Sequence, residues 1–217
     1  MVHIKQFEFS PFQENTYVLY SDQKNCWIID PGCYYPEEKQ ALADFIATEG
    51  LTPTRLLNTH CHLDHVFGNA FVHDTYGLKP QYHKKDVPTM KMAPVSASMY
   101  GIPGFDPSPE PETFLKEGET LTLDGHRAEL RFCPGHAPGH LIFVFHEDHF
   151  IIGGDVLFKG SIGRTDLPGG DHATLLESIR KEVYVLPDDF KVYSGHGPVT
   201  TVGEEKRSNP FVRDTNH

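Results

Sequence analysis

The chain has 217 residues, 38% of them hydrophobic and 23% charged, and its formal net charge is −11 at neutral pH. This mix is typical of a folded globular protein, and the excess of acidic side chains argues against nucleic acid as a partner. No apolar run approaches the roughly 18 residues that cross a membrane, and the first residues do not resemble a secretory signal, so we expect a cytoplasmic protein with reduced cysteines.

In the amino-terminal half of the chain, runs of β-branched and aromatic residues alternate with amphipathic segments. The runs at 16–20, 26–30 and 55–58 predict strands, and the first two predict a hairpin because only a short polar segment separates them. Residues 36–50 predict a helix, since a proline opens the segment, acidic residues occupy its first turn and a glycine closes it. A second helix is predicted over residues 65–76, again followed by a glycine.

The segment 84–112 has a different character, because it is rich in proline and holds three of the chain's four methionines. Its proline content predicts that no long helix forms there, and its apolar side chains are untypical of a free linker. We expect a loop or lid that lies over the body of the protein. The alternative is a poorly ordered surface excursion.

The carboxy-terminal half is predicted to consist mainly of strands, with one helix over residues 172–186. Strands are predicted at 120–123, 126–132, 141–145 and 150–155, and again from residue 191. Because strands and helices alternate with extra hairpins between them, the sequence indicates an α/β protein with mixed sheets. No internal repeat is visible, and we expect a single domain over residues 1–217.

The segment NTHCHLDHVFGN, residues 58–69, contains four candidate metal ligands within six positions. In an extended chain, residues i and i+2 point the same way, so His60 and His62 can bind one ion. Asp64 and His65 follow where the chain turns into a helix and therefore project in another direction. One loop thus offers two pairs of ligands, which favours two adjacent ions over one. Imidazole and carboxylate ligands suit zinc, iron or manganese, and zinc is our first expectation.

Three later loops carry a histidine or an aspartate beside glycine, each at the end of a predicted strand. Their sequences are CPGHAPGH at 133–140, GGD at 153–155 and SGHGP at 194–198. The carboxyl ends of strands are where α/β sheets tend to place their binding sites. We therefore expect these loops to complete the site that the first histidine cluster begins.

The motifs HxHxDH, PGH, GD and GHG, in this order, resemble those of the metallo-β-lactamase superfamily, and the resemblance spans residues 14–200. It implies a four-layer αββα sandwich in which two mixed sheets are flanked by helices. It also implies two metal ions. The first would be bound by His60, His62 and His136. The second would be bound by Asp64, His65 and His196, and Asp155 would bridge the two.

The resemblance also decides between two candidate ligands and assigns a role to one further residue. It favours His136 over His140, because the ligand of the family is the first histidine after the Pro-Gly pair. Asp30, in the segment IIDPG, matches an aspartate of the family that orients the metal-binding loop.

Within the superfamily, GSIGRTDLPGGD at 160–171 is similar to the short, single-domain glyoxalase II type of thioester hydrolase. The resemblance implies that a hydroxide bridging two metals cleaves a thioester such as a hydroxyacylglutathione, with Asp64 and Asp155 as catalytic residues. Arg164 and Lys159 flank the site loop, and we expect them to hold a carboxylate of this small-molecule substrate. The chain departs from the longer glyoxalase II enzymes, which have a helical carboxy-terminal domain and a lysine and a tyrosine where Arg164 and Asp166 stand here. The thiol carrier and the oligomeric state are left open.

Several alternatives share these motifs. The first is a persulfide dioxygenase of the same fold, which uses a single iron held by two histidines and an aspartate. A metal-binding or redox module without hydrolysis is a second, although no additional domain or partner motif supports it. A β-lactamase is a third, and the expected cytoplasmic location and the GRTD loop argue against it.

Overall fold

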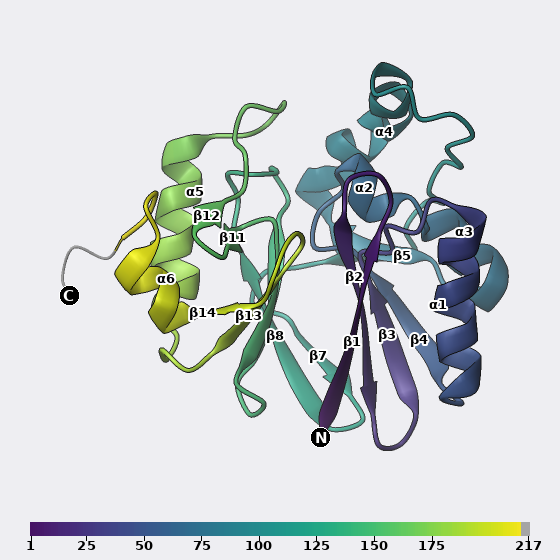
Figure 1. Cartoon of the computed structure of the whole chain (residues 1–217), viewed down its shortest axis with the longest axis horizontal. Coiled ribbons are helices and arrows are strands. Elements are labelled where there is room, and N and C mark those ends of the chain that lie inside the picture. Colours follow the sequence, from purple (N-terminus) through teal and green to yellow (C-terminus); the bar gives the residue numbers. More distant parts are fainter. Residues whose placement is uncertain (214–217) are drawn as a thin grey trace.

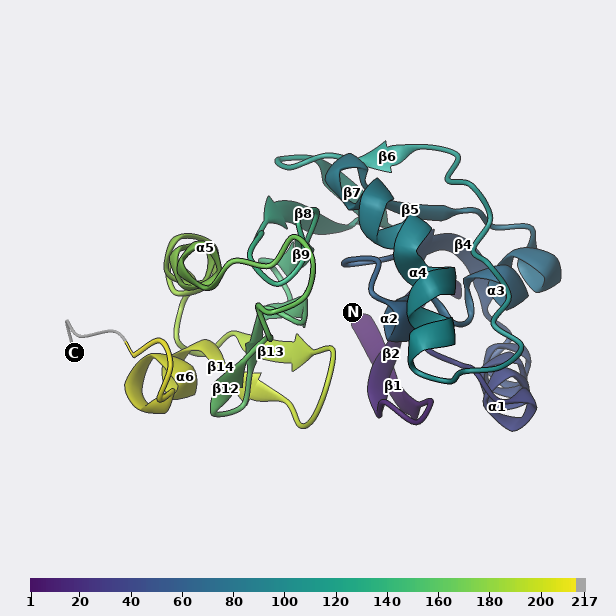
Figure 2. The ribbon, with the colours of Figure 1, turned by 90° about the horizontal axis from the view of Figure 1, so that it is seen from above.

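Two mixed β-sheets face each other across the centre of the molecule, as the computed structural model shows (Figures 1 and 2). The structure describes residues 1–213; residues 214–217, the end of the predicted 1–217 domain, lie outside the described residues. The first sheet has the order β1 (Val2–Phe9), β2 (Glu14–Ser21), β3 (Asn25–Ile29), β4 (Thr52–Leu57), β5 (Pro80–His83), β6 (Phe114–Leu115). The second has the order β14 (Thr200–Thr201), β13 (Lys191–Ser194), β10 (Phe150–Gly154), β9 (Leu141–Phe145), β8 (His126–Phe132), β7 (Thr120–Leu123).

Both sheets combine parallel and antiparallel neighbours. In the first, β1, β2 and β3 are antiparallel, whereas β3 to β6 are parallel. In the second, β7 to β10 are antiparallel, β13 runs parallel to β10, and β14 is antiparallel to β13. A short ribbon of β11 (Leu157–Phe158) and β12 (Ser161–Ile162) stands beside the second sheet. The predicted mixed sheets are confirmed.

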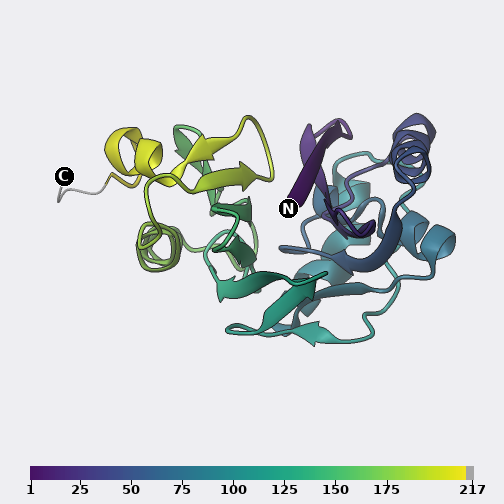
Figure 3. The same cartoon turned by 90° about the horizontal axis from the view of Figure 1, so that it is seen from below.

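Helices cover the outer face of each sheet, so the molecule has four layers (Figure 3). The first sheet is covered by α1 (Pro36–Thr48) and α3 (Asn69–Tyr76). The second is covered by α5 (His172–Ser178), which continues into one π-helical turn (Ile179–Val183), and by α6 (Val202–Ser208). The predicted four-layer αββα sandwich is confirmed.

Strand alternation explains why this stack is stable. Trp27 faces the other sheet and joins the central core with Phe143, whereas its neighbour Ile28 packs against Leu42 of α1. Because successive side chains point to opposite faces, a strand that is apolar at every position buries both of its faces. Burial of apolar area contributes about 25 cal/mol per Å², so these interfaces dominate the stability of the fold.

Most sequence predictions of secondary structure are confirmed, and the second predicted helix is divided. Residues 65–76 form the end of α2 (Leu63–Val66) and then α3, with a break at Gly68. The amide of Gly68 donates a hydrogen bond to the carbonyl oxygen of Pro31 at 2.7 Å, outside any helix. The four cysteines are free and buried, and the described part of the chain has no helix long and apolar enough to cross a bilayer.

The prediction that segment 84–112 forms no long helix is wrong. A 3₁₀ turn (Lys84–Asp86) leads into α4 (Val87–Met99), which lies over α2 (Figure 2). Pro88 stands in the first turn, where a missing N–H removes no helical hydrogen bond. Pro94 lies inside the helix and does remove one. Burial of Ala93 and Ala97 against α2 offsets this loss, which is a tertiary effect that proline content does not reveal.

Candidate metal centre

Loops at the carboxyl ends of four strands bring the predicted ligands together. The loop after β4 carries His60, His62, Asp64 and His65; the loops after β8, β10 and β13 carry His136, Asp155 and His196. Among the described residues, three groups of candidate metal ligands have their ligand atoms within 4.8 Å of one another. Two of these groups correspond to the predicted pair of metal sites.

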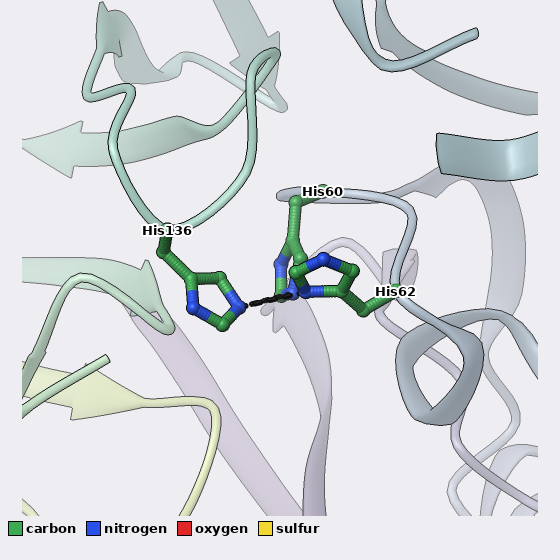
Figure 4. A group of neighbouring side chains, drawn as sticks. All are labelled: His60, His62 and His136. Carbon is green, nitrogen blue, oxygen red and sulfur yellow. Dashed lines mark hydrogen bonds between the residues drawn. The ribbon is translucent and has the colours of Figure 1, made fainter. Parts of the chain in front are cut away.

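The first group consists of His60, His62 and His136, whose rings converge (Figure 4). The Nε2 atom of His136 lies 2.8 Å from Nδ1 of His62 and 3.2 Å from Nε2 of His60. Burial lowers the pKa of His62 to about 3, and the neighbouring His136 adds to the effect. Burial also lowers the pKa of His60 and of His136, so these rings are neutral and able to act as ligands at neutral pH.

Hydrogen bonds identify which nitrogens of this group carry lone pairs. Nδ1 of His136 faces the carbonyl oxygen of Arg164 at 2.7 Å, so this nitrogen carries the proton. Nδ1 of His60 lies 3.0 Å from Oγ1 of Thr59, whose hydroxyl donates to Asp30 and therefore accepts from His60. The Nε2 atoms of His60 and His136 consequently both carry lone pairs. These two atoms lie 3.2 Å apart, so their lone pairs face each other. Two facing lone pairs repel unless a cation lies between them, so this arrangement fits a metal ion.

The second group consists of Asp64, His65 and His196. Nε2 of His196 lies 3.0 Å from Oδ2 of Asp64. Nδ1 of His65 is 3.2 Å from Oδ2 of Asp30, while its Nε2 is buried and has no hydrogen-bond partner. That nitrogen points between two carboxylates, at 3.7 Å from Asp64 and 3.4 Å from Asp155. A buried ring nitrogen that faces two carboxylates without a hydrogen bond also fits a divalent cation.

Asp155 lies between the two groups. Its Oδ2 is 3.5 Å from Nε2 of His136, and its Oδ1 is 3.4 Å from Nε2 of His65 and 3.1 Å from Nδ1 of His196. One carboxylate thus has an oxygen on each side. The backbone approaches closely here, since a Cβ on Gly195 would lie 2.2 Å from Oδ1 of Asp155.

His140 stands behind this centre. Its Nε2 accepts the backbone N–H of Asp155 at 3.0 Å, and its ring stacks on His60 with centroids 4.7 Å apart. It belongs to none of the three ligand groups. The sequence choice of His136 over His140 therefore agrees with the geometry.

Asp30 supports the loop that carries the first ligands. Its carboxylate accepts the backbone N–H of Thr59 at 2.7 Å and the hydroxyl of Thr59 at 2.6 Å, besides its contact with His65. Asp30, His60 and His65 form the third group. With three donors around it, the Asp30 carboxylate has the contacts of a supporting residue, as the resemblance implies for this position.

Sequence analysis missed two residues of β2 that belong to the centre. Glu14 is fully buried, its Oε1 has no hydrogen-bond partner, and that atom lies 3.7 Å from Nδ1 of His65. Burial raises the pKa of Glu14 well above its usual value. The side chain of Asn15 donates to the carbonyl oxygens of Ser194 and Gly197, which flank His196. No motif marked these two residues, which belong to a polar stretch at the start of β2.

A cavity of about 690 Å³ opens over the centre. Its floor contains side chains of both groups, and its walls come from α4 and from the segment 158–169. Arg164 lines this cavity, with its guanidinium paired to Asp166 at 2.7 and 2.8 Å. Lys159 does not line it, and its Nζ lies 3.5 Å from Oε1 of Glu204 on α6.

His196 leads to a prediction about protons. Burial alone would lower its pKa, but the carboxylates of Asp155 and Asp64 raise it to about 10. The metal-free protein therefore carries a protonated His196 at pH 8, and a metal ion must displace that proton. We expect zinc binding at pH 8 to release about one proton more from the wild type than from a His196→Ala variant. Calorimetric titration in buffers of different ionisation enthalpy measures this number, and equal release from both proteins would contradict the prediction.

Comparison with known proteins identifies the family. The model of the "Metallo-beta-lactamase superfamily" matches residues 9–196. The chain belongs to this superfamily. The chain is 41% identical to the "Hydroxyacylglutathione hydrolase GloC" of Haemophilus influenzae, over 97% of this chain and 98% of that relative.

Two solved structures are similar to this chain over nearly their whole length. The di-iron-bound form of TTHA1623 has a TM-score of 0.85 and 37% identity, covering 95% of this chain and 99% of that one. The BLEG-1 B3 metallo-beta-lactamase has a TM-score of 0.87 and 36% identity, covering 98% of this chain and 100% of that one. The metallo-β-lactamase fold expected from the motifs is therefore shown.

Proposed function

We propose that this protein is a hydrolase that holds two divalent metal ions and cleaves a small-molecule thioester, as a hydroxyacylglutathione hydrolase does. The observation that carries the proposal is Asp155, whose two carboxylate oxygens face two separate groups of ligands at the floor of a cavity. A carboxylate in that position can bridge neighbouring cations. The 41% identity to a protein named hydroxyacylglutathione hydrolase supports the substrate class.

In this proposal the first metal is held by His60, His62 and His136, and the second by Asp64, His65 and His196, with Asp155 shared. Zinc remains our first expectation, and the di-iron-bound form of a 37% identical protein supports iron as an alternative. Two divalent cations bound there would lower the pKa of a shared water toward about 7 and would polarise a substrate carbonyl. Asp64 and Asp155 act as ligands whose charge the cations neutralise.

The walls of the cavity suit an acyl thioester. Pro88, Met92, Ser96 and Tyr100 are spaced four residues apart, so they form one stripe of α4 that faces the cavity. The wall formed by the segment 158–169 is mostly apolar, with Phe158, Ile162, Leu167 and Pro168. Arg164 is placed to hold a carboxylate of the thiol carrier. Lys159 is left out of the proposal, because its side chain does not line the cavity.

A strong general acid is not required for this reaction. A thiol has a pKa of about 8.5, so a thiolate leaves without being protonated. The cavity accordingly offers metal ligands, largely apolar walls and two cationic side chains, Lys85 and Arg164, and the protonated His196 of the metal-free protein becomes a neutral ligand. A site that works without a strong general acid favours thioesters over substrates with poorer leaving groups.

β-Lactam hydrolysis is a second candidate, because the BLEG-1 structure, named a B3 metallo-beta-lactamase, is 36% identical over nearly the whole chain. A single panel distinguishes the candidates. Protein loaded with measured amounts of zinc, iron or manganese is assayed with S-lactoylglutathione, an apolar acylglutathione, an acyl-coenzyme A and a cephalosporin. Oxygen uptake is followed separately with glutathione persulfide.

We expect thioester hydrolysis to require two metal ions per chain and to exceed cephalosporin hydrolysis by more than about 100-fold, a transition-state difference of about 2.7 kcal/mol. Cleavage of the cephalosporin alone would replace the proposal by the second candidate. One iron per chain together with oxygen uptake would instead show a persulfide dioxygenase.

A further inference from the structure

We infer that Asp86 is a positioning residue that joins the two loops of the first histidine group and thereby sets the affinity of that metal site. Asp86 directly precedes α4 and is fully buried. It lies outside every motif that indicated a metal site. The inference rests on the proposed two-metal centre, but not on the identity of the substrate.

The contacts of Asp86 are directed at both loops. Its Oδ2 accepts the backbone N–H of Cys61 at 2.6 Å, and its Oδ1 accepts the backbone N–H of Gly139 at 2.8 Å. Cys61 stands between His60 and His62, and Gly139 follows His136 in the later loop. One carboxylate therefore holds the segments that supply all three histidines of the first group.

These two segments are far apart in sequence, since 74 positions separate His62 from His136. A backbone hydrogen bond from Leu141 to Thr59 at 2.8 Å also joins them. Asp86 adds the contact nearer to the ligands. With two attachment points, neither loop can rotate about the other without breaking a hydrogen bond.

The chemistry of Asp86 indicates a geometric role. Burying a carboxylate is costly unless it is paired, and none of the ion pairs among residues 1–213 involves Asp86. Its donors are two backbone amides, the hydroxyl of Thr89 at 3.2 Å and the thiol of Cys61. A carboxylate accepts from both amides at once, whereas an asparagine would turn its NH₂ group toward one of them.

Gly139 allows the close approach that this contact needs. A Cβ at position 139 would lie 2.5 Å from the backbone nitrogen of Asp86 and 2.7 Å from its Cβ. Both of these atoms are held in place by the start of α4. A Gly139→Ala substitution therefore pushes the second loop away from Asp86 while leaving the carboxylate in the protein.

The second ligand group is supported by other residues. Asp30 contacts His65, Asn58 donates to the carbonyl oxygen of His65, and Asn15 holds the segment around His196. None of these contacts passes through Asp86. Loss of the Asp86 carboxylate should consequently weaken one metal site more than the other, which a general loss of stability would not do.

The test is a titration of the metal-free, full-length protein with Co²⁺, followed by visible absorption and by competition with a chelator. We expect wild-type protein to bind two ions. In Asp86→Asn and in Gly139→Ala, we expect one ion to bind with nearly wild-type affinity and the other to bind on the order of 10- to 100-fold more weakly. Thr89→Val is the matched control, because it removes the third hydrogen bond of Asp86 and neither loop contact, and should leave both affinities unchanged.

Circular dichroism and thermal melts of the same variants separate folding from positioning. A lower melting temperature with two unchanged cobalt affinities, or equal weakening of both ions, would overturn the inference. If wild-type protein binds a single ion, the two-metal proposal fails, and the positioning role is then decided by whether Asp86→Asn weakens that ion.

Discussion

Replacing Asp155 by alanine is expected to remove tight binding of both metal ions and to lower kcat/KM by more than about 100-fold, since losing even a supporting contact of a metal ligand costs 10- to 100-fold. The reason is its position, with Oδ2 toward His136 and Oδ1 toward His65 and His196. Among the predicted ligands in residues 1–213, only Asp155 has a carboxylate within 4.0 Å of ring nitrogens of both groups. Loss of a carboxylate that serves a single site would leave the other site occupied.

Asp155→Asn sharpens this test. The amide keeps the volume of the side chain and one acceptor oxygen, so it can face one ligand group but offers no second oxygen to the other. We expect it to retain at most one ion per chain, as measured by metal analysis after gel filtration. Asp171→Ala is the matched control, because Asp171 is an exposed aspartate that caps α5 through the amide of Thr174. Two tightly bound metals and unchanged hydrolysis in Asp155→Ala would rule out the bridging role.

His136 and His140 should respond to substitution in opposite ways, although only three residues separate them. His136→Ala is expected to lose the ion of the first group and to lower kcat/KM by more than about 100-fold. The reason is that the Nε2 atom of His136 carries the lone pair that faces His60. His140→Ala should retain both ions. Its contact is with the backbone N–H of Asp155, and its ring lies behind His60.

The cost of His140→Ala should appear in stability. The substitution leaves the buried N–H of Asp155 without an acceptor, which costs about 1–3 kcal/mol. For a chain of this size, that loss lowers the melting temperature by roughly 2–4 °C per kcal/mol. His140→Gln restores an acceptor in a side chain of similar length and should recover part of the loss. If His140→Ala instead lost a metal while His136→Ala kept both, the assignment of the loop would be wrong.

Local sequence was sufficient to propose the four candidate ligands of the first cluster, because their relation is set by short-range backbone geometry, whereas the assignment of His136, Asp155 and His196 came from the family resemblance. His60 and His62 are two residues apart in an extended segment, and Asp64 and His65 stand where α2 begins, so their two directions follow from spacing. The strands were predictable for a similar reason. A run such as residues 26–29 is apolar at every position because both of its faces are buried.

Tertiary structure decided what supports those ligands. Glu14, Asn15 and Asp86 reach the centre from elements that are distant in sequence, and a single acid or amide in a strand or before a helix has no local signature. Lys159 was expected to contact substrate from its place beside the site loop, but α6 supplies Glu204 as its partner. The helix α4 forms despite Pro94 because Ala93 and Ala97 are buried against α2. Spacing along the chain determines directions between near neighbours, whereas contacts between remote segments depend on how the layers pack, and packing is a property of the whole fold.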